Sequence, residues 1–289
     1  MDEIKVGVVY PQIELGGDPA AVKRIGRATE DLGFDYLLAY DHVLGAVHEG
    51  REPPLLGPYT EHDPFHDPLV MFAYLAGITE RIGFATGILI LPQRQTVLVA
   101  RQAADLDLFS GGRLRLGVGI GWNHVEYDAL GQDFSTRGRR EEEQIDLLRR
   151  LWSDDVVTFE GQFDRVDRAA LVPPPQRRIP IWLGGFGEAA FARAARVGDG
   201  FMFGGGTAQV FDSWKRVKEL LGEGGRSVEG FGAESFVRTD KGPEAAVDRM
   251  HEWRDAGGTH ASVVTMGHGF TTVDEHVDYL VRVATALQR

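Results

Sequence analysis

The chain has 289 residues, with 31 basic and 43 acidic side chains and no cysteine, which excludes disulfide bonds, cysteine-ligated metals and thiol nucleophiles. Its formal net charge of −12 argues against a protein that follows nucleic-acid phosphates, because such proteins carry a basic surface. No stretch approaches the roughly 20 apolar residues of a membrane-spanning helix, and residues 1–5 lack the basic and then apolar order of a signal peptide. We therefore expect a cytoplasmic protein whose partner is a small molecule, not nucleic acid or a membrane.

Short apolar runs alternate with helical segments along the chain. The first run, 4–10, is rich in valine, as is typical of a buried parallel strand. Asp18 and Pro19 then begin a helix, because Asp caps a helix well and Pro suits its first position. Further strands are predicted at 34–40, 82–91, 114–120, 179–184, 200–203, 232–237 and 261–266. Helices are predicted near 19–32, 69–79, 96–109, 137–152, 188–196, 207–221, 243–256 and 273–287.

This strict alternation indicates an α/β fold with parallel strands and right-handed crossovers. Eight strand–helix units in this length favour a (β/α)₈ TIM barrel, with an open doubly wound sheet as the alternative. Two insertions interrupt the pattern, at 43–67 after the second strand and at 153–178 before the fifth. The second contains a plausible hairpin at 156–163. We find no linker, so the prediction is one domain spanning 1–289.

Asp41 and His42 directly follow the second strand, on the face where barrel active sites lie. A histidine there can donate or accept a proton near neutral pH, and Asp41 could orient it or hold a polar ligand group. Alternatively, the pair only closes the loop through backbone hydrogen bonds. His42 is our candidate catalytic residue.

Glycines mark the ends of three other strands. Gly87, beside Thr86 and Ile88, indicates a bulge or the close approach of another molecule, or else a packing position. Around Gly119, Gly121 and Trp122 the glycine spacing does not match a dinucleotide-binding motif. It is better explained by a flat ligand at the barrel mouth, or by small residues that fill the interior.

The segment Gly184-Gly185-Phe186-Gly187 joins the fifth strand to a helix. Glycines at a helix N-terminus expose N–H groups that bind phosphate, although Glu188 counts against an anion there and a tight turn is the alternative. The charged run 137–143 is typical of a solvated helix face, from which one arginine could reach a phosphate.

Histidine and aspartate near the first insertion raise the question of a metal site, which we do not predict. Barrel metallohydrolases begin with His-x-His after the first strand, where this chain has Tyr10-Pro11-Gln12. A helical pairing of His62 with His66 is disfavoured by Pro64 and Pro68.

In this order, the segments resemble the luciferase-like monooxygenase superfamily of flavin- and deazaflavin-dependent (β/α)₈ proteins. The resemblance covers nearly the whole chain. It is carried by 32–35 with Asp41-His42, by 100–107 with 110–113, and by 180–185 with 194–200. The glycines at 117–121 with Trp122, Glu126 and Gly131, and then 137–140, are similar to the branch that uses coenzyme F420.

The resemblance implies hydride transfer between coenzyme F420 and a small organic substrate at the C-terminal mouth of the barrel. It makes His42 the proton donor or acceptor, and it implies a non-proline cis peptide at Gly87-Ile88 behind the cofactor ring. The residues expected to contact the cofactor are Asp41, Thr86, Gly87, Ile88, Gly119, Gly121, Trp122, Gly184, Gly185, Phe186 and Gly187. The last four would receive its phosphate.

Two other functions stay open: an FMN-dependent monooxygenase supplied with reduced flavin by a partner reductase, and a non-catalytic deazaflavin-binding protein. Sugar-phosphate dehydrogenases of the family carry an acidic residue where this chain has Trp122, which argues against glucose 6-phosphate as substrate. Tyr40, Tyr59, Phe65 and Phe72 suggest an apolar pocket, although core packing accounts for aromatic residues equally well. Family members are commonly dimers, so a homodimer is a further expectation.

Overall fold

A closed barrel of parallel strands forms the centre of the protein, as seen in a computed structural model that describes residues 4–289. Residues 1–3, part of the N-terminal segment considered above, lie outside the described residues. The barrel strands are β1 (Lys5–Val9), β2 (Tyr36–Ala39), β3 (Gly83–Thr86), β4 (Leu89–Ile90), β5 (Leu114–Gly119), β8 (Ile181–Gly185), β9 (Gly200–Phe203), β10 (Gly232–Val237) and β11 (His260–Val264). Their order is β3-β2-β1-β11-β10-β9-β8-β5-β4, and pairing of β3 with β5 closes the ring.

The closed ring confirms the predicted eight-stranded barrel over the open sheet. The third position is shared by β3 and β4, which pair with successive parts of β5. The prediction of one continuous strand over 82–91 was therefore wrong, because Gly87 and Ile88 leave the ladder between the two short strands.

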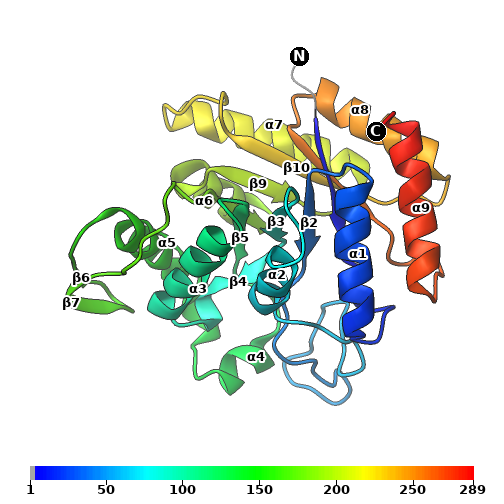
Figure 1. Ribbon diagram of the computed structural model, residues 1–289. Helices are drawn as coiled ribbons and strands as arrows, with labels where there is room; N and C mark the ends of the chain where they lie inside the picture. Colours follow the sequence, from blue (N-terminus) through cyan, green and yellow to red (C-terminus); the bar gives the residue numbers. More distant parts are fainter. Residues whose placement is uncertain (1–3) are drawn as a thin grey trace.

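Helices surround the barrel in the predicted positions (Figure 1). They are α1 (Pro19–Asp31), α2 (Pro68–Ala76), α3 (Thr96–Phe109), α5 (Arg137–Ser153), α6 (Glu188–Val197), α7 (Thr207–Glu223), α8 (Pro243–Asp255) and α9 (Val273–Ala286). Asp18 caps α1 by accepting a 2.9 Å hydrogen bond from the Ala20 N–H, as its position predicted. Helix α2 ends three residues before the predicted 79, because it stops at Gly77, a poor helix former.

Alternating side chains separate the barrel interior from the layer beneath the helices. Tyr36 and Leu38 of β2 and Met202 of β9 pack inside the barrel. Leu37 and Phe201, on the alternate positions, belong to the larger core between barrel and helices. This two-layer packing holds the strands between the interior and the helices, and so supports the residues of the mouth.

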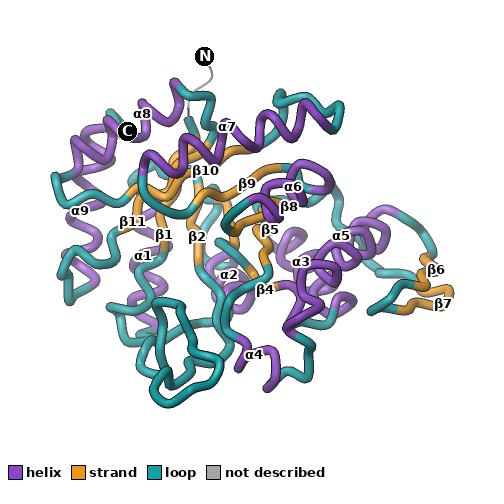
Figure 2. The backbone as a smooth tube through the Cα atoms, turned by 180° about the vertical axis from the view of Figure 1, so that it is seen from behind, coloured by secondary structure: helices purple, strands orange, loops and turns teal. Residues whose placement is uncertain are grey.

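The two insertions take different forms. Residues 43–67 form a long irregular segment below the strands, beside α4 (Figure 2). The second insertion contains the antiparallel hairpin of β6 (Val157–Glu160) and β7 (Arg165–Ala169), which projects away from the barrel (Figure 1). The sequence did not predict α4 (His124–Ala129) or the short turns η1 (Leu91–Gln93) and η2 (Phe134–Thr136).

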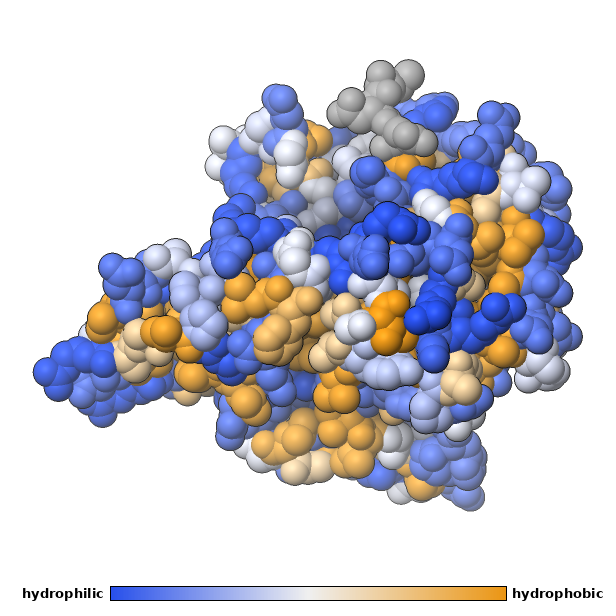
Figure 3. Space-filling model, in the orientation of Figure 1, coloured by the Kyte–Doolittle hydropathy of each residue, from blue (hydrophilic) through white to orange (hydrophobic). Residues whose placement is uncertain are grey.

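Apolar side chains gather over α2 and α3 on the face shown in Figure 3. The exposed apolar residues of these two helices include Val70, Tyr74, Val97 and Leu98. Within residues 4–289, no helix is both long enough and apolar enough to cross a membrane.

Candidate active site

His42 and Glu126 form a buried pair at the carboxyl end of β2. The His42 Nδ1 lies 3.0 Å from Glu126 Oε2, and the Glu126 side chain is fully buried. An ionised carboxylate only accepts hydrogen bonds, so Nδ1 carries the proton and Nε2 is left to exchange one. Nε2 has no hydrogen-bond partner among residues 4–289. The geometry therefore equips His42 as a proton acceptor or donor.

Aromatic side chains enclose this histidine. The ring of His42 lies 5.4 Å from Tyr59, 4.8 Å from Phe65 and 5.3 Å from Trp122, each in an edge-on arrangement. Tyr59 and Phe65 come from the insertion 43–67, which thus packs over the site. The predicted apolar surroundings are present for these residues and for Tyr40, which contacts Phe236 inside the mouth. Phe72, however, packs against Phe84 in the outer core.

The same insertion is fastened to the strand ends by backbone contacts. Glu126 Oε1 accepts hydrogen bonds from the N–H groups of Val43 at 2.5 Å and Leu44 at 3.1 Å. The N–H of Val125 is in turn capped by Asn123, which begins α4. This short helix, which was not predicted from the sequence, therefore supplies the partner of His42. The spacing Asn-x-x-Glu was the available signal, since it marks a helix start.

Asp41 has partners within the protein. Its Oδ2 accepts from the Ile90 N–H at 2.9 Å, and its Oδ1 accepts from Arg94 Nη2 at 2.7 Å. Arg94 also reaches Asp67, which caps α2 through the N–H groups of Leu69 and Val70. Burial raises the pKa of Asp41 and the charge of Arg94 opposes that shift. Asp41 thus links β2 to β4 directly and to α2 through Arg94. This role is structural, and the expected contact with the cofactor ring would be added to it.

Ile88, Gly119 and Gly184 meet at the floor of the mouth. A Cβ added to Gly119 would lie 2.8 Å from the Ile88 Cδ1, and one added to Gly184 would lie 2.6 Å from the Ile88 Cγ2. The two glycines therefore make room for the half-buried Ile88 side chain, against which a flat ring could lie. The Gly87-Ile88 peptide bond is cis, as the resemblance implied.

The predicted phosphate cradle leads from β8 into α6. Gly187 is the N-cap of α6 and gives it no side-chain cap, so the first N–H groups of the helix are not satisfied by a side chain. Glu188 is held by Arg216 at 2.7 Å, and this hydrogen bond lowers the pKa of Glu188. The carboxylate that counted against an anion is thus neutralised by α7. Phe186 is exposed at the rim.

Two predicted contact residues make contacts within the barrel wall. Thr86 is fully buried and its hydroxyl donates to the Gly117 carbonyl at 2.6 Å, which links β3 to β5. Gly121 makes the turn after β5 with a φ of 62°, where an added Cβ would lie 2.8 Å from the Ile90 Cγ2. Arg137 of the charged run also has a local partner, since its guanidinium lies 3.7 Å over the Phe134 ring.

Within residues 4–289, no group of three histidine, aspartate or glutamate side chains is placed to hold a metal ion. His48, another histidine of the first insertion, contacts the Tyr59 carbonyl at 2.9 Å.

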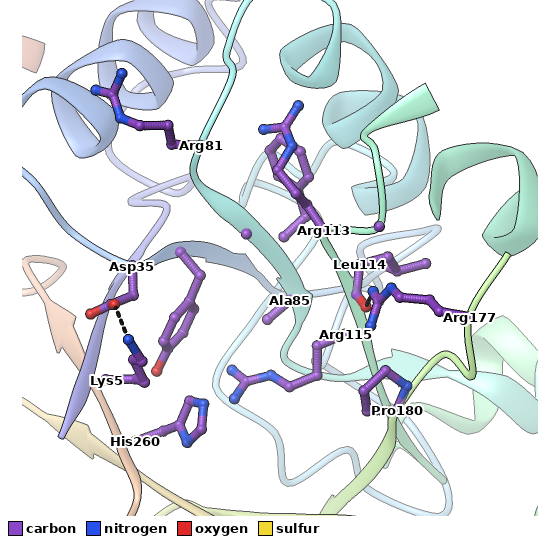
Figure 4. Close-up of a pocket in the computed structure, with 14 residues that line it drawn as sticks. Lys5, Asp35, Arg81, Ala85, Arg113, Leu114, Arg115, Arg177, Pro180 and His260 are labelled. Carbon is purple, nitrogen blue, oxygen red and sulfur yellow. Dashed lines mark hydrogen bonds and ion pairs between the residues drawn. The ribbon is translucent and has the colours of Figure 1, made fainter. Parts of the chain in front are cut away.

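A cavity of about 350 Å³ lies at the opposite, N-terminal end of the barrel, where Arg115 and His260 point inward and Arg81 points away (Figure 4). Arg115 lies between the rings of Tyr36 and Trp182, at 4.5 and 4.1 Å. Its Nη2 donates to the buried Glu234 at 2.7 Å. Burial, and then the charges of Arg115 and Lys5, lower the pKa of His260 to about 2. Paired charges and a neutral histidine indicate a structural cluster at this end.

Comparison with known proteins decides the family of this chain. The luciferase-like monooxygenase family matches residues 4–280. The chain belongs to this family. It is therefore an oxidoreductase of the luciferase-like class.

Several relatives of this luciferase-like protein can be compared in more detail. An uncharacterized protein of Mycobacterium tuberculosis is 36% identical over 233 residues, which cover 75% of this chain and 81% of the relative. The F420-dependent glucose-6-phosphate dehydrogenase of Nocardia farcinica is 29% identical over 263 residues, covering 88% of this chain and 74% of the relative. An F420-dependent secondary alcohol dehydrogenase, solved with an F420-acetone adduct, shares the fold with a TM-score of 0.81 at 17% identity over 100% of both chains.

Proposed function

We propose that this protein transfers a hydride between coenzyme F420 and a small organic substrate at the C-terminal mouth of the barrel. The observation that carries the proposal is the His42–Glu126 pair, which fixes one tautomer of a histidine whose Nε2 has no partner among residues 4–289. The F420-dependent relatives support the choice of cofactor over FMN.

The residues of the mouth fit a flat, phosphate-bearing cofactor. Ile88 offers an apolar surface over Gly119 and Gly184, and the uncapped first turn of α6 offers N–H groups for a phosphate. When bound, the cofactor would supply the hydride transfer. His42 would hold or release the accompanying proton at Nε2, and Tyr59, Phe65 and Trp122 would exclude water from it. A homodimer stays a prediction of the sequence.

Separate titrations of the purified protein with F420 and with FMN test the cofactor. We expect F420 to bind at least tenfold more tightly, and tighter binding of FMN would contradict the proposal. A substrate screen with the bound cofactor follows, using His42→Ala as the matched variant. The variant should bind F420 within a few-fold of the wild type and lose 100-fold or more of the turnover, as expected for a proton-transfer residue. Turnover that does not depend on His42 would contradict its role.

A further inference from the structure

Two cavities adjoin at the carboxyl end of β10, away from His42 and the floor of the mouth. One of about 310 Å³ lies between the first turn of α7 and helix α8, and the other, of about 420 Å³, lies beside the loops after β10 and β11. Arg238 and Arg249 line both cavities. These two residues therefore lie where the two spaces meet.

Neither arginine has a carboxylate partner among residues 4–289. Arg249 is half-buried, and its Nη1 donates to the Arg238 carbonyl at 2.7 Å. The guanidinium of Arg238 is exposed and lies over Gly267, where an added Cβ would come within 3.0 Å of its Cζ. By contrast, the half-buried Arg94 and Arg193 each pair with two carboxylates. Two arginines without an ion pair thus line cavities in a chain whose net charge is −12.

Two acids, Glu14 and Asp240, lie near these arginines without forming an ion pair with either one among residues 4–289. Burial raises the pKa of Glu14, and the charge of Arg238 opposes that shift. Glu14 uses Oε1 to accept from the Gly267 N–H at 2.7 Å, and its Oε2 lies 3.3 Å from His276. Asp240 borders the larger cavity, where it forms no ion pair with a residue of the described chain. Burial and then the charge of Arg238 lower the pKa of His268, which lines the same cavity. This imidazole is therefore neutral at pH 7 and adds no charge of its own to the cavity.

The first turn of α7 adds hydrogen-bond donors to the smaller cavity. Gly205, Gly206 and Thr207 line it, and the N-cap Gly206 provides no side-chain hydrogen bond. No acidic residue lies in this turn, whereas α9 is closed by a capping box of Thr272 and Glu275. The positive end of α7 thus reinforces the field of the two arginines.

We propose that Arg238 and Arg249 form an anion-binding site for the phosphate or carboxylate group of a small molecule. The pairing of two guanidinium groups with an oxyanion would offset the cost of leaving a half-buried charge without a counter-ion. The site uses none of the residues Gly184–Gly187 and does not depend on the proposed function.

Inorganic phosphate is the probe for this site, added to the full-length protein at low ionic strength to limit screening. Amide chemical shifts of Gly206 and Gly267 report binding where the arginines lie, separately from any phosphate held at the start of α6. We expect saturable shifts of both signals. In Arg238→Gln the apparent affinity should fall about tenfold, and in the double variant with Arg249→Gln the shifts should disappear.

Arg27→Gln is the matched control, because Arg27 is an exposed arginine without an ion pair among residues 4–289. It should leave the phosphate shifts unchanged. Wild-type protein without saturable shifts, or a double variant that binds as the wild type does, would overturn the proposal. Arg238 is exposed, so Arg238→Gln is expected to fold. Its affinity for phosphate therefore tests the proposal even if the double variant fails to fold.

A second comparison identifies the source of the anion. If the double variant weakens F420 binding but not that of the deazaflavin chromophore without its phosphate side chain, the site holds the cofactor. If phosphate binding is lost while F420 affinity is unchanged, the site holds an anionic group of the substrate or of another small molecule. Failure of F420 to bind at all would count against the proposed function and leave the phosphate result standing.

Discussion

Glu126 joins three parts of the candidate site through one buried carboxylate. Oε2 faces His42 and Oε1 accepts from two amides at the start of the insertion 43–67. Both oxygens are therefore occupied, which offsets the cost of burying the charge. We infer that Glu126 is a positioning residue, which acts on the reaction through the tautomer of His42.

The variant Glu126→Gln separates these contacts. Its amide oxygen can still accept from Val43 and Leu44, but its NH₂ group would face His42 and favour proton loss from Nδ1. We therefore expect the imidazole to carry its proton on Nε2 instead, which ¹⁵N chemical shifts of the ring detect directly. Turnover should fall about 10–100-fold, while F420 affinity and the melting temperature change little.

Glu126→Ala serves as the control, because it removes both sets of contacts. This variant should also lower the melting temperature and loosen the insertion. If Glu126→Gln retains a proton on Nδ1 and full turnover, the positioning role of Glu126 is refuted.

At the scale of elements, periodicity and caps were enough to place the barrel. Apolar runs separated by helical segments predicted all eight strand positions. Parallel strands that are buried on both faces leave this strong signal of continuous apolar residues. The insertions were harder, since their conformation depends on contacts with distant residues. Helix α4 spans only six residues, too few for a periodic pattern. The packing of Trp122 under the insertion has no signal in local sequence.

The candidate site, like the fold, was predicted from the sequence only in part. Positions after strands pointed to His42 and to the glycine floor, because the topology itself brings strand ends together. The sequence could not show that Asp41 pairs with Arg94, or that Thr86 bonds to Gly117. Those contacts join residues 31 and 53 positions apart, and only the closed barrel determines them.

Gly57 fixes the insertion 43–67 against the site. An added Cβ would lie 2.1 Å from the Trp122 ring, and a rigid indole cannot move aside easily. We expect Gly57→Ala to displace the insertion and lower the free energy of unfolding by about 1–3 kcal/mol. Urea unfolding measures the loss, and limited proteolysis should show faster cleavage within 43–67.

The matched control for that change is Gly222→Ala. Gly222 lies in α7 with no atom within 4 Å of an added Cβ, so alanine should be neutral or stabilising by up to about 1 kcal/mol. Equal stability and equal protease resistance of Gly57→Ala and the wild type would show that Gly57 does not hold the insertion.

Across the whole molecule, charge is arranged differently at the two ends of the barrel. At the N-terminal end Arg115 is paired with the buried Glu234, and Lys5 is paired with Asp35. At the C-terminal end Arg238 and Arg249 have no such partners among residues 4–289. The acidic chain therefore still holds two arginines without ion pairs on the face that also holds His42. A site for one anion there is compatible with the negative net charge of the chain, because binding depends mainly on the charges closest to the anion.

The pH dependence of the protein's stability should also reveal a buried histidine that the reaction does not use. His276 is fully buried between Thr265 and Glu14, at 2.8 and 3.3 Å, and burial lowers its pKa to about 4. The ordinary pKa is 6.5, so the unfolded chain binds a proton first as the pH falls. The contribution of neutral His276 to the free energy of unfolding is complete above about pH 6.5. It is lost as the pH falls to about 4, by up to about 3 kcal/mol.

Urea unfolding from pH 7 to pH 4 should therefore show a shallower loss of stability in His276→Gln than in the wild type. The exposed His62, changed to Gln, should retain the wild-type slope, and identical slopes for all three proteins would mean that His276 does not contribute.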